Sequence, residues 1–100
     1  MQVSLLYFDG CPNWRETEQL VLAALADSGV ETRLTYVHVD THEDAERLGF
    51  RGSPTVLVDG RDPFASPEDP VGLACRVFRT PDGLRGAPTV EQLRKALEVD

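Results

Sequence analysis

The chain has 100 residues, 41% of them apolar, and a formal net charge of -7. This length suits one domain with a single core, residues 1–100, and the apolar fraction argues against a disordered chain. The negative charge and the lack of a basic cluster argue against nucleic-acid binding, which needs Lys and Arg to replace counterions at phosphates. The apolar runs are too short for a membrane span, so we expect no membrane partner.

The first half of the chain predicts a strand, a helix, a second strand and a short helix. The continuously apolar run from Val3 to Phe8 is typical of a strand covered on both faces. Helical spacing of apolar residues extends from Pro12 to Ser28. The segment from Arg33 to Asp40 is rich in β-branched and aromatic residues and predicts the next strand. Thr41 can then cap a short helix from His42 to Leu48.

The second half predicts two more strands and a last helix. A third strand is expected from Thr55 to Asp59, a loop over 61–74, a fourth strand from Cys75 to Arg79, and a turn at 81–83. A final helix is expected from Thr89 through Val99. The predicted order is β-α-β-α-β-β-α, an α/β domain with a four-stranded mixed sheet. Its first two strands should be parallel, its last two antiparallel, and helices should cover both faces.

A cysteine stands where the first strand passes into the first helix. The first N–H groups of a helix lack internal partners and carry partial positive charge, so a thiolate at Cys11 would be stabilised over the thiol. The thiolate is the nucleophilic form. Arg15, on the first helical turn, could add to this effect. The competing interpretation is that Cys11 is a small buried apolar residue, which is common for a free cysteine.

Two motifs resemble the thioredoxin-like superfamily, together with the order of elements and over nearly the whole chain. They are F-D-G-C-P-N-W, ending at Trp14, and G-F-R-G-S-P-T-V-L-V-D-G, which contains Ser53, Pro54 and Thr55. The resemblance implies a thioredoxin-like fold in which Pro54 is cis and packs against Cys11. It also implies that Ser53 offers its backbone to an extended thiol substrate.

The chain departs from this family's usual Cys-x-x-Cys motif, because Trp14 occupies the position of the second cysteine. In one interpretation Cys11 acts as a monothiol and a small-molecule thiol resolves the mixed disulfide. In another, Cys75 resolves it. In a third, the chain is a redox-inactive binding module, or a thiol protein for a soft metal such as mercury or copper(I).

The expected place of Cys75 argues against its pairing with Cys11. A disulfide needs Cα atoms within roughly 7 Å, and a strand of five residues spans on the order of 16 Å. If Cys75 opens the fourth strand, it lies at the far end of the sheet and faces the core with Val77. We therefore expect no direct pairing unless the 61–74 loop folds back.

The sequence thus predicts thiol–disulfide exchange by a monothiol oxidoreductase whose catalytic residue is Cys11. Its partner would be a thiol or disulfide of a protein or a small molecule. No metal and no organic cofactor is expected, apart from a low-molecular-weight thiol as co-substrate. The start of the chain lacks a signal-peptide pattern, so we expect a cytoplasmic protein with reduced cysteines. The oligomeric state is left open.

Several residues around the thiol receive supporting assignments. Pro12 would pre-set the start of the helix, and Trp14 is expected to lie partly exposed near the thiol. His38, Asp40 and His42 are interpreted as a strand end and a helix cap rather than as metal ligands. It stays open whether one imidazole tunes the thiolate.

Overall fold

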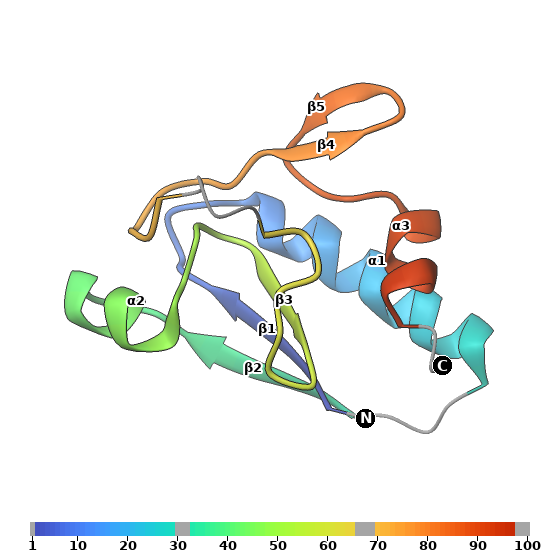
Figure 1. Cartoon of the computed structure of the whole chain (residues 1–100), viewed down its shortest axis with the longest axis horizontal. Helices are drawn as coiled ribbons and strands as arrows, with labels where there is room; N and C mark the ends of the chain where they lie inside the picture. The colour runs from blue at the N-terminus through green and yellow to red at the C-terminus, as the bar shows by residue number, and fades with distance from the viewer. Residues whose placement is uncertain (1, 30–32, 66–69, 98–100) are drawn as a thin grey trace.

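The structure, a computed structural model, describes residues 2–29, 33–65 and 70–97. It is a mixed α/β fold in which helices surround a small sheet and a hairpin stands apart from that sheet (Figure 1). The described elements are β1 Val3–Tyr7, α1 Asn13–Ser28, β2 Leu34–His38, α2 His42–Leu48, β3 Thr55–Val58, β4 Phe78–Thr80, β5 Gly83–Arg85 and α3 Val90–Ala96. The order therefore contains one strand more than the sequence predicted.

The sheet has three strands in the order β2-β1-β3. Strand β1 lies in the centre and pairs in parallel with β2, so that Val3 lies opposite Leu34. On its other side β1 pairs with β3 in an antiparallel arrangement, so that Val3 also lies opposite Val58. The parallel pairing of the first two strands is confirmed. A central strand covered on both faces accounts for the unbroken apolar run with which the chain begins.

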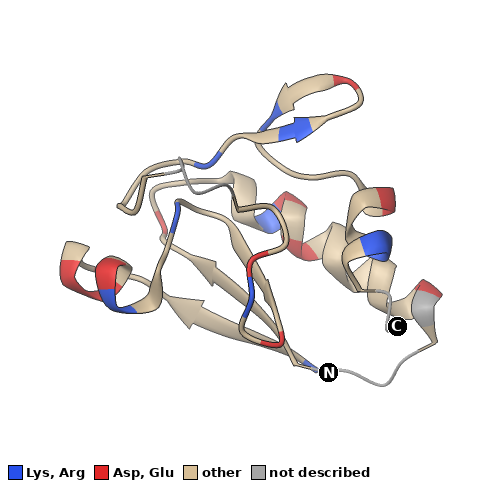
Figure 2. Cartoon of the chain, viewed as in Figure 1, with Lys and Arg blue, Asp and Glu red and all other residues tan. Residues whose placement is uncertain are grey.

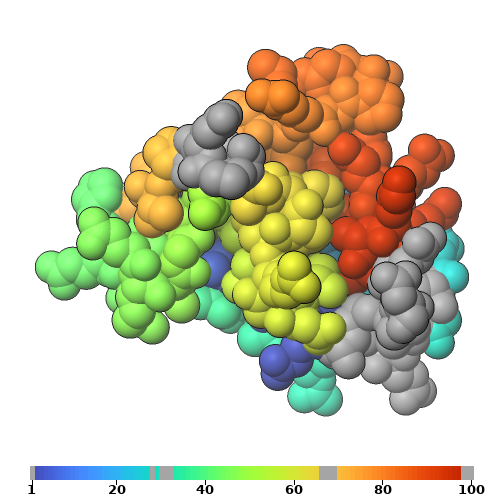
Figure 3. Space-filling model, viewed as in Figure 1, coloured from blue at the N-terminus to red at the C-terminus, as the bar shows by residue number. Residues whose placement is uncertain are grey.

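The predicted four-stranded sheet is wrong. The segment from Cys75 to Arg79 does not join β3; instead β4 and β5 form a separate antiparallel hairpin. The turn at 81–83 explains the difference, because it brings Arg79 opposite Leu84 with a short connection. Pairing β4 with β3 would have required closing the long 61–74 loop, and a local hairpin costs less chain entropy. In the space-filling view the hairpin forms an edge of the molecule (Figure 3).

Helices cover both faces of the sheet, as predicted. Alternate residues of β1 point to opposite faces. On one face, Leu5 of β1 packs with residues of α1 and α3, including Val21 and Leu93. On the other face, Leu6 packs with Ala45 of α2. The core thus has two layers, and the sheet separates them.

The helix ends follow local sequence signals. The Thr41 side chain accepts a hydrogen bond from Asp44 N at 3.1 Å, and Thr89 forms a capping box with Gln92. Both caps are confirmed. Helix α1 begins one residue after the predicted Pro12, which serves as its N-cap. The predicted end of the last helix at Val99 lies outside the described residues. No helix in the described ranges is long and apolar enough to cross a membrane.

Candidate thiol site

Cys11 lies at the joint between β1 and α1, as the sequence indicated, but it is fully buried. Its exposed fraction is 0%, and its backbone N–H donates to Phe8 O at 3.3 Å. Pro12 follows in helical conformation, and α1 starts at Asn13 with no side-chain cap. The thiol therefore lies at the start of α1 on the side that faces the protein interior, not on the side that faces solvent.

The nearest polar partner of the Cys11 sulfur belongs to the proline turn before β3. Cys11 Sγ donates a hydrogen bond to Ser53 O at 3.3 Å, and the Ser53–Pro54 peptide bond is cis. The Ser53 hydroxyl accepts a longer bond of 3.4 Å from Phe8 N, at the end of β1. The two motifs that carry the family resemblance thus meet in space, and the cis bond that the resemblance implied is present.

The backbone of Ser53 is fully engaged within the chain. Ser53 N donates to Ala74 O at 2.8 Å, and Arg76 N donates to Ser53 O at 2.9 Å. These two bonds make a parallel bridge between Ser53 and Cys75. The resemblance implied that this backbone binds an extended substrate, but in the structure the chain's own segment 74–76 occupies that position.

The fold of this segment brings the second cysteine to the first. Cys75 is exposed. The pKa of its thiol is raised, mainly by a hydrogen bond with the Cys11 side chain and to a smaller extent by partial loss of hydration. The expectation that Cys75 lies in the core, away from Cys11, is wrong. It assumed a sheet strand at this point, whereas residues 72–76 fold back along Ser53. One buried thiol and one exposed thiol therefore lie in contact.

A glycine and its tight surroundings hold segment 74–76 in this position. Gly52 has φ +111, and a Cβ there would lie 2.9 Å from Ala74 O and 3.1 Å from Arg76 Cβ. Such an approach is available only to glycine. The Thr55 hydroxyl donates to Gly52 O at 2.6 Å and fixes the turn from the other side. Thr55 is thus a structural support for the site.

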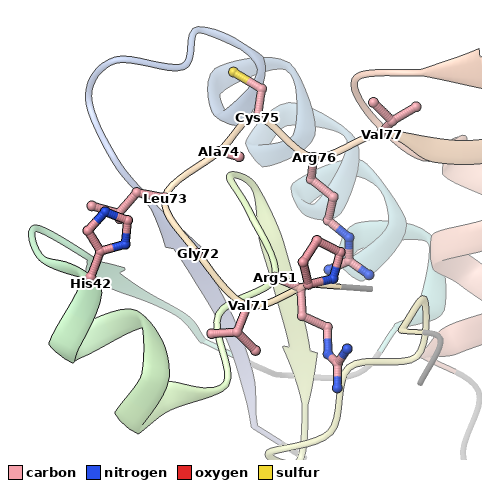
Figure 4. Close-up of a pocket in the computed structure, with 10 residues that line it drawn as sticks. His42, Arg51, Val71, Gly72, Leu73, Ala74, Cys75, Arg76 and Val77 are labelled. Atoms are coloured by element: carbon pink, nitrogen blue, oxygen red, sulfur yellow. The ribbon is translucent and has the colours of Figure 1, made fainter. Parts of the chain in front are cut away.

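A buried ion pair anchors the same segment. Arg76 Nη1 lies 2.6 Å from Asp62 Oδ2, and the two side chains are only 5% and 9% exposed. Arg76 also donates to the Thr55 hydroxyl at 3.4 Å. Arg76 and Asp62 were not assigned to the site by sequence reasoning. The side chain of Arg76 points away from that of Cys75 (Figure 4). The ion pair of Arg76 with Asp62 therefore fixes the backbone whose opposite side carries the Cys75 thiol.

Trp14 and Arg15 form a separate stack of side chains. Trp14 is half-buried, and its ring stacks on Tyr7 with centroids 4.3 Å apart. The Arg15 guanidinium lies over the Trp14 ring at 4.8 Å. Arg15 is therefore engaged with an aromatic ring, and no described interaction joins it to Cys11. The fourth position of the motif supplies packing at the start of α1 in place of a thiol.

His38 lies beside this stack and is held by two carboxylates. Its Nε2 is 3.1 Å from Asp9 Oδ2, and its Nδ1 is 2.8 Å from Asp40 Oδ1. Among the described residues, no group of three or more His, Cys, Asp or Glu side chains could hold a metal ion. The described part of the structure therefore contains no conventional metal centre with three or more such ligands.

A groove of about 460 Å³ opens beside Cys75 (Figure 4). A volume of this size falls within the range of ligand pockets in proteins. The side chains that line it are mainly apolar and come from segment 70–77, from α2 and from the residue before Gly52; they include His42, Arg51, Val71, Leu73, Cys75 and Val77. Cys75 thus belongs both to the thiol pair and to the wall of a cavity.

Comparison with known proteins does not assign the site. No protein-family model matches the chain, and searches of curated proteins and of solved structures find no match either. The function must therefore be argued from the chemistry of the side chains. The pair formed by Cys11 and Cys75 is the feature that this chemistry singles out.

The contact between the thiols predicts how Cys75 reacts with an alkylating agent. Because Cys11 raises the pKa of Cys75, less Cys75 thiolate is present at neutral pH than in an ordinary thiol. A Cys11→Ala variant should lower the Cys75 pKa, so the plot of Cys75 alkylation rate against pH should move to lower pH. Iodoacetamide with mass-spectrometric detection of Cys75 measures this plot, and the urea-unfolded chain is the reference. An unchanged plot would show that the thiols do not interact.

Proposed function

We propose that the chain carries out thiol–disulfide exchange through two thiols, with Cys75 meeting the substrate and Cys11 resolving the intermediate. The observation that carries the proposal is that the exposed Cys75 is bridged to Ser53, whose carbonyl oxygen accepts the hydrogen bond of the buried Cys11 thiol. Thiols in hydrogen-bond contact need only a small movement to form a disulfide. This proposal keeps the predicted chemistry and the predicted need for Cys11, and it replaces the predicted monothiol route by a route with two thiols.

The exchange proceeds in two displacement steps. In the first, the Cys75 thiolate attacks one sulfur of the substrate disulfide, forms a mixed disulfide and releases the other substrate sulfur as a thiolate. In the second, Cys11 loses its proton to the released thiolate and attacks Cys75 Sγ. The Cys11–Cys75 bond forms, the bond between Cys75 and the substrate sulfur breaks, and the second substrate sulfur leaves as a thiolate. Two electrons pass from the protein to the substrate.

The return to the reduced state requires a reductant. Two molecules of a low-molecular-weight thiol, or one dithiol, can break the Cys11–Cys75 bond by the same displacements and become oxidised. A reducing compartment such as the cytoplasm supplies thiols of this kind. Cys75 suits the first step because it is exposed, whereas Cys11 is buried; the raised pKa of Cys75 leaves less thiolate at neutral pH, so the step should accelerate as the pH rises.

We further infer that the chain is a divergent relative of the thioredoxin-like superfamily. Its support is the parallel β1-α1-β2 unit, the cysteine between β1 and α1, and the hydrogen bond that this cysteine donates to Ser53 O, directly before Pro54 and β3. The chain differs from that family in its three-stranded sheet and in the position of its second thiol. Because segment 74–76 supplies the second thiol, the fourth position of the Cys-x-x-Cys motif does not need a cysteine and is occupied by Trp14.

Oxidation with a small disulfide tests the proposal directly. The native protein is treated with hydroxyethyl disulfide, blocked with iodoacetamide and digested with a protease. We expect one cross-linked peptide pair that joins Cys11 to Cys75, and its disappearance after reduction. If both cysteines remain alkylated after prolonged oxidant treatment, the pair is not a redox centre and the proposal fails.

A second candidate function is binding of a soft metal ion by the same two thiols. Thiolates select copper(I) and mercury(II), and both ions accept two ligands in a line. The contact between Cys11 and Cys75 supplies two sulfurs, and no third His, Cys, Asp or Glu side chain joins them in the part of the chain that the structure describes. Titration with mercury(II) should then show binding of one ion per chain that is lost in both single Cys→Ser variants. One-to-one binding without formation of the Cys11–Cys75 disulfide would favour this function over exchange.

A further inference from the structure

Residues 75–79 alternate between solvent and core. Cys75, Val77 and Arg79 are exposed, whereas Arg76 and Phe78 are buried. This alternation is that of an extended chain with one buried face. The side chains of Val77 and Arg79 therefore point to the same side of the chain as the exposed thiol of Cys75.

Leu84 of β5 completes this surface. It pairs with Arg79 across the hairpin, and directly opposed residues of an antiparallel pair point to the same side. Val77 and Leu84 are 59% and 66% exposed, more than any other large apolar residue for which the structure gives an exposed fraction. We call the surface formed by Cys75, Val77, Arg79 and Leu84 the outer face.

The outer face carries the positive charge of Arg79, although the chain as a whole is acidic. Arg76 is buried against Asp62, and Arg85 lies opposite Phe78, on the other side of the hairpin from Leu84, so Arg79 is the arginine of this face; the net charge of the chain is -7. Figure 2 shows the arginines on the strands of the hairpin and the acidic residue at its turn. Within the described residues, neither Arg79 nor Arg85 takes part in an ion pair. The charge of Arg79 is therefore available to an acidic partner on the outer face.

The apolar groove continues the outer face on the other side of the thiol. Cys75 and Val77 line the groove together with Val71 and Leu73 (Figure 4). An extended segment that places its cysteine against Cys75 would therefore contact apolar side chains both before and after that cysteine. A small disulfide would reach Cys75 without touching Leu84.

From this arrangement we propose that the outer face and the groove bind an extended segment of a protein substrate, whose cysteine is flanked by apolar and acidic residues. The proposal rests on the proposed exchange function and names its substrate class. The apolar contacts come from Val71, Val77 and Leu84, and the acidic residues of the substrate face Arg79. This surface selects protein disulfides of that composition over small disulfides.

Two chromogenic probes test the proposal. One is a short peptide with valine and glutamate on either side of a cysteine that carries thionitrobenzoate as a mixed disulfide; the other is the symmetric disulfide of thionitrobenzoate. Release of the coloured thiol gives the rate constant for each. We expect Val77→Glu and Leu84→Glu each to slow the reaction of the peptide about fivefold or more. Leu84 does not line the groove, so Leu84→Glu should change the reaction of the small probe less than about twofold.

Charge reversal gives an independent arm of the same experiment. Arg79→Glu should slow the acidic peptide about fivefold and should accelerate a peptide in which lysine replaces glutamate. Leu22→Glu, at an exposed position of α1, is the matched control and should leave both peptides unaffected. We expect each variant to fold, because the substituted side chains are exposed, and circular dichroism checks this.

The outcomes separate this proposal from the exchange function. If the small probe reacts and the peptide rates are the same in all variants, the docking surface is disproved and the exchange function stands. If neither probe reacts with the native protein, both the exchange function and this proposal are disproved. Light scattering tests whether a second copy of the chain, and not a substrate, binds the outer face. A native dimer that becomes monomeric in Val77→Glu would show that it does and would overturn the proposal.

Discussion

Replacing Cys75 with serine is expected to slow exchange with a small disulfide by about two orders of magnitude or more, because a hydroxyl is a poor nucleophile at neutral pH. Cys11 cannot compensate in this variant, since its sulfur is fully buried and bonded to Ser53 O. The Cys11→Ser variant should behave differently. It should release one equivalent of substrate thiol and then stop as a mixed disulfide on Cys75. Stopped-flow measurement of thiol release distinguishes the two patterns.

The asymmetry between the two serine variants is what separates a two-thiol route from a monothiol route. If Cys75→Ser retains the native rate, the substrate reaches Cys11 directly and the monothiol interpretation of the sequence is correct. If Cys11→Ser keeps turning over with the native rate, Cys75 acts alone. Mass spectrometry of each variant after reaction with one equivalent of substrate, without added thiol, identifies the cysteine that carries the mixed disulfide.

Removing the carboxylate partner of Arg76 should cause the largest loss of stability. An Asp62→Ala variant leaves the Arg76 guanidinium buried without its ion-pair partner, and breaking a buried pair in this way costs about 3–5 kcal/mol. Urea unfolding followed by circular dichroism measures the change in free energy of unfolding. Because Arg76 anchors the segment that carries Cys75, formation of the Cys11–Cys75 disulfide should slow in the same variant.

An exposed ion pair provides the control for this prediction. Asp27 pairs with Arg94 between α1 and α3, and both side chains are about half exposed. Asp27→Ala should therefore cost about 1 kcal/mol or less. A double variant, Asp62→Leu with Arg76→Met, should recover most of the lost stability, because apolar side chains of similar volume replace a buried pair well. Equal losses in Asp62→Ala and Asp27→Ala would contradict the burial argument.

The sequence predicted those parts of the structure that local signals determine. The caps at Thr41 and Thr89 depend on residues within one helical turn. The cysteine at the joint and the cis-proline were assigned from two motifs, and the structure places Cys11 Sγ against Ser53 O, next to Pro54. Sequence reasoning is strong where the chemistry and its cause lie in one short segment.

The parts that were missed depend on contacts between distant segments. The run from Cys75 to Arg79 has the alternation of a strand, but alternation does not name the strand's partner. A hairpin partner was available nearby, so the expected pairing with β3 did not form. The contact between Cys75 and Cys11 follows from bonds of Ser53 to residues 74 and 76, and no local pattern indicates them. The ion pair of Arg76 with Asp62 is hidden for the same reason.

The adjacency of Cys75 and Arg76 constrains how this protein can vary during evolution. Successive residues of an extended chain point to opposite sides, so a single insertion between them would turn the thiol and the guanidinium to the same side, and one of the two would lose its place. The loop that precedes them carries no such requirement, because loops accept changes of length more readily than paired segments do. We therefore expect homologous sequences to keep a cysteine followed directly by an arginine, while the number of residues between Asp62 and that dipeptide differs from one species to another.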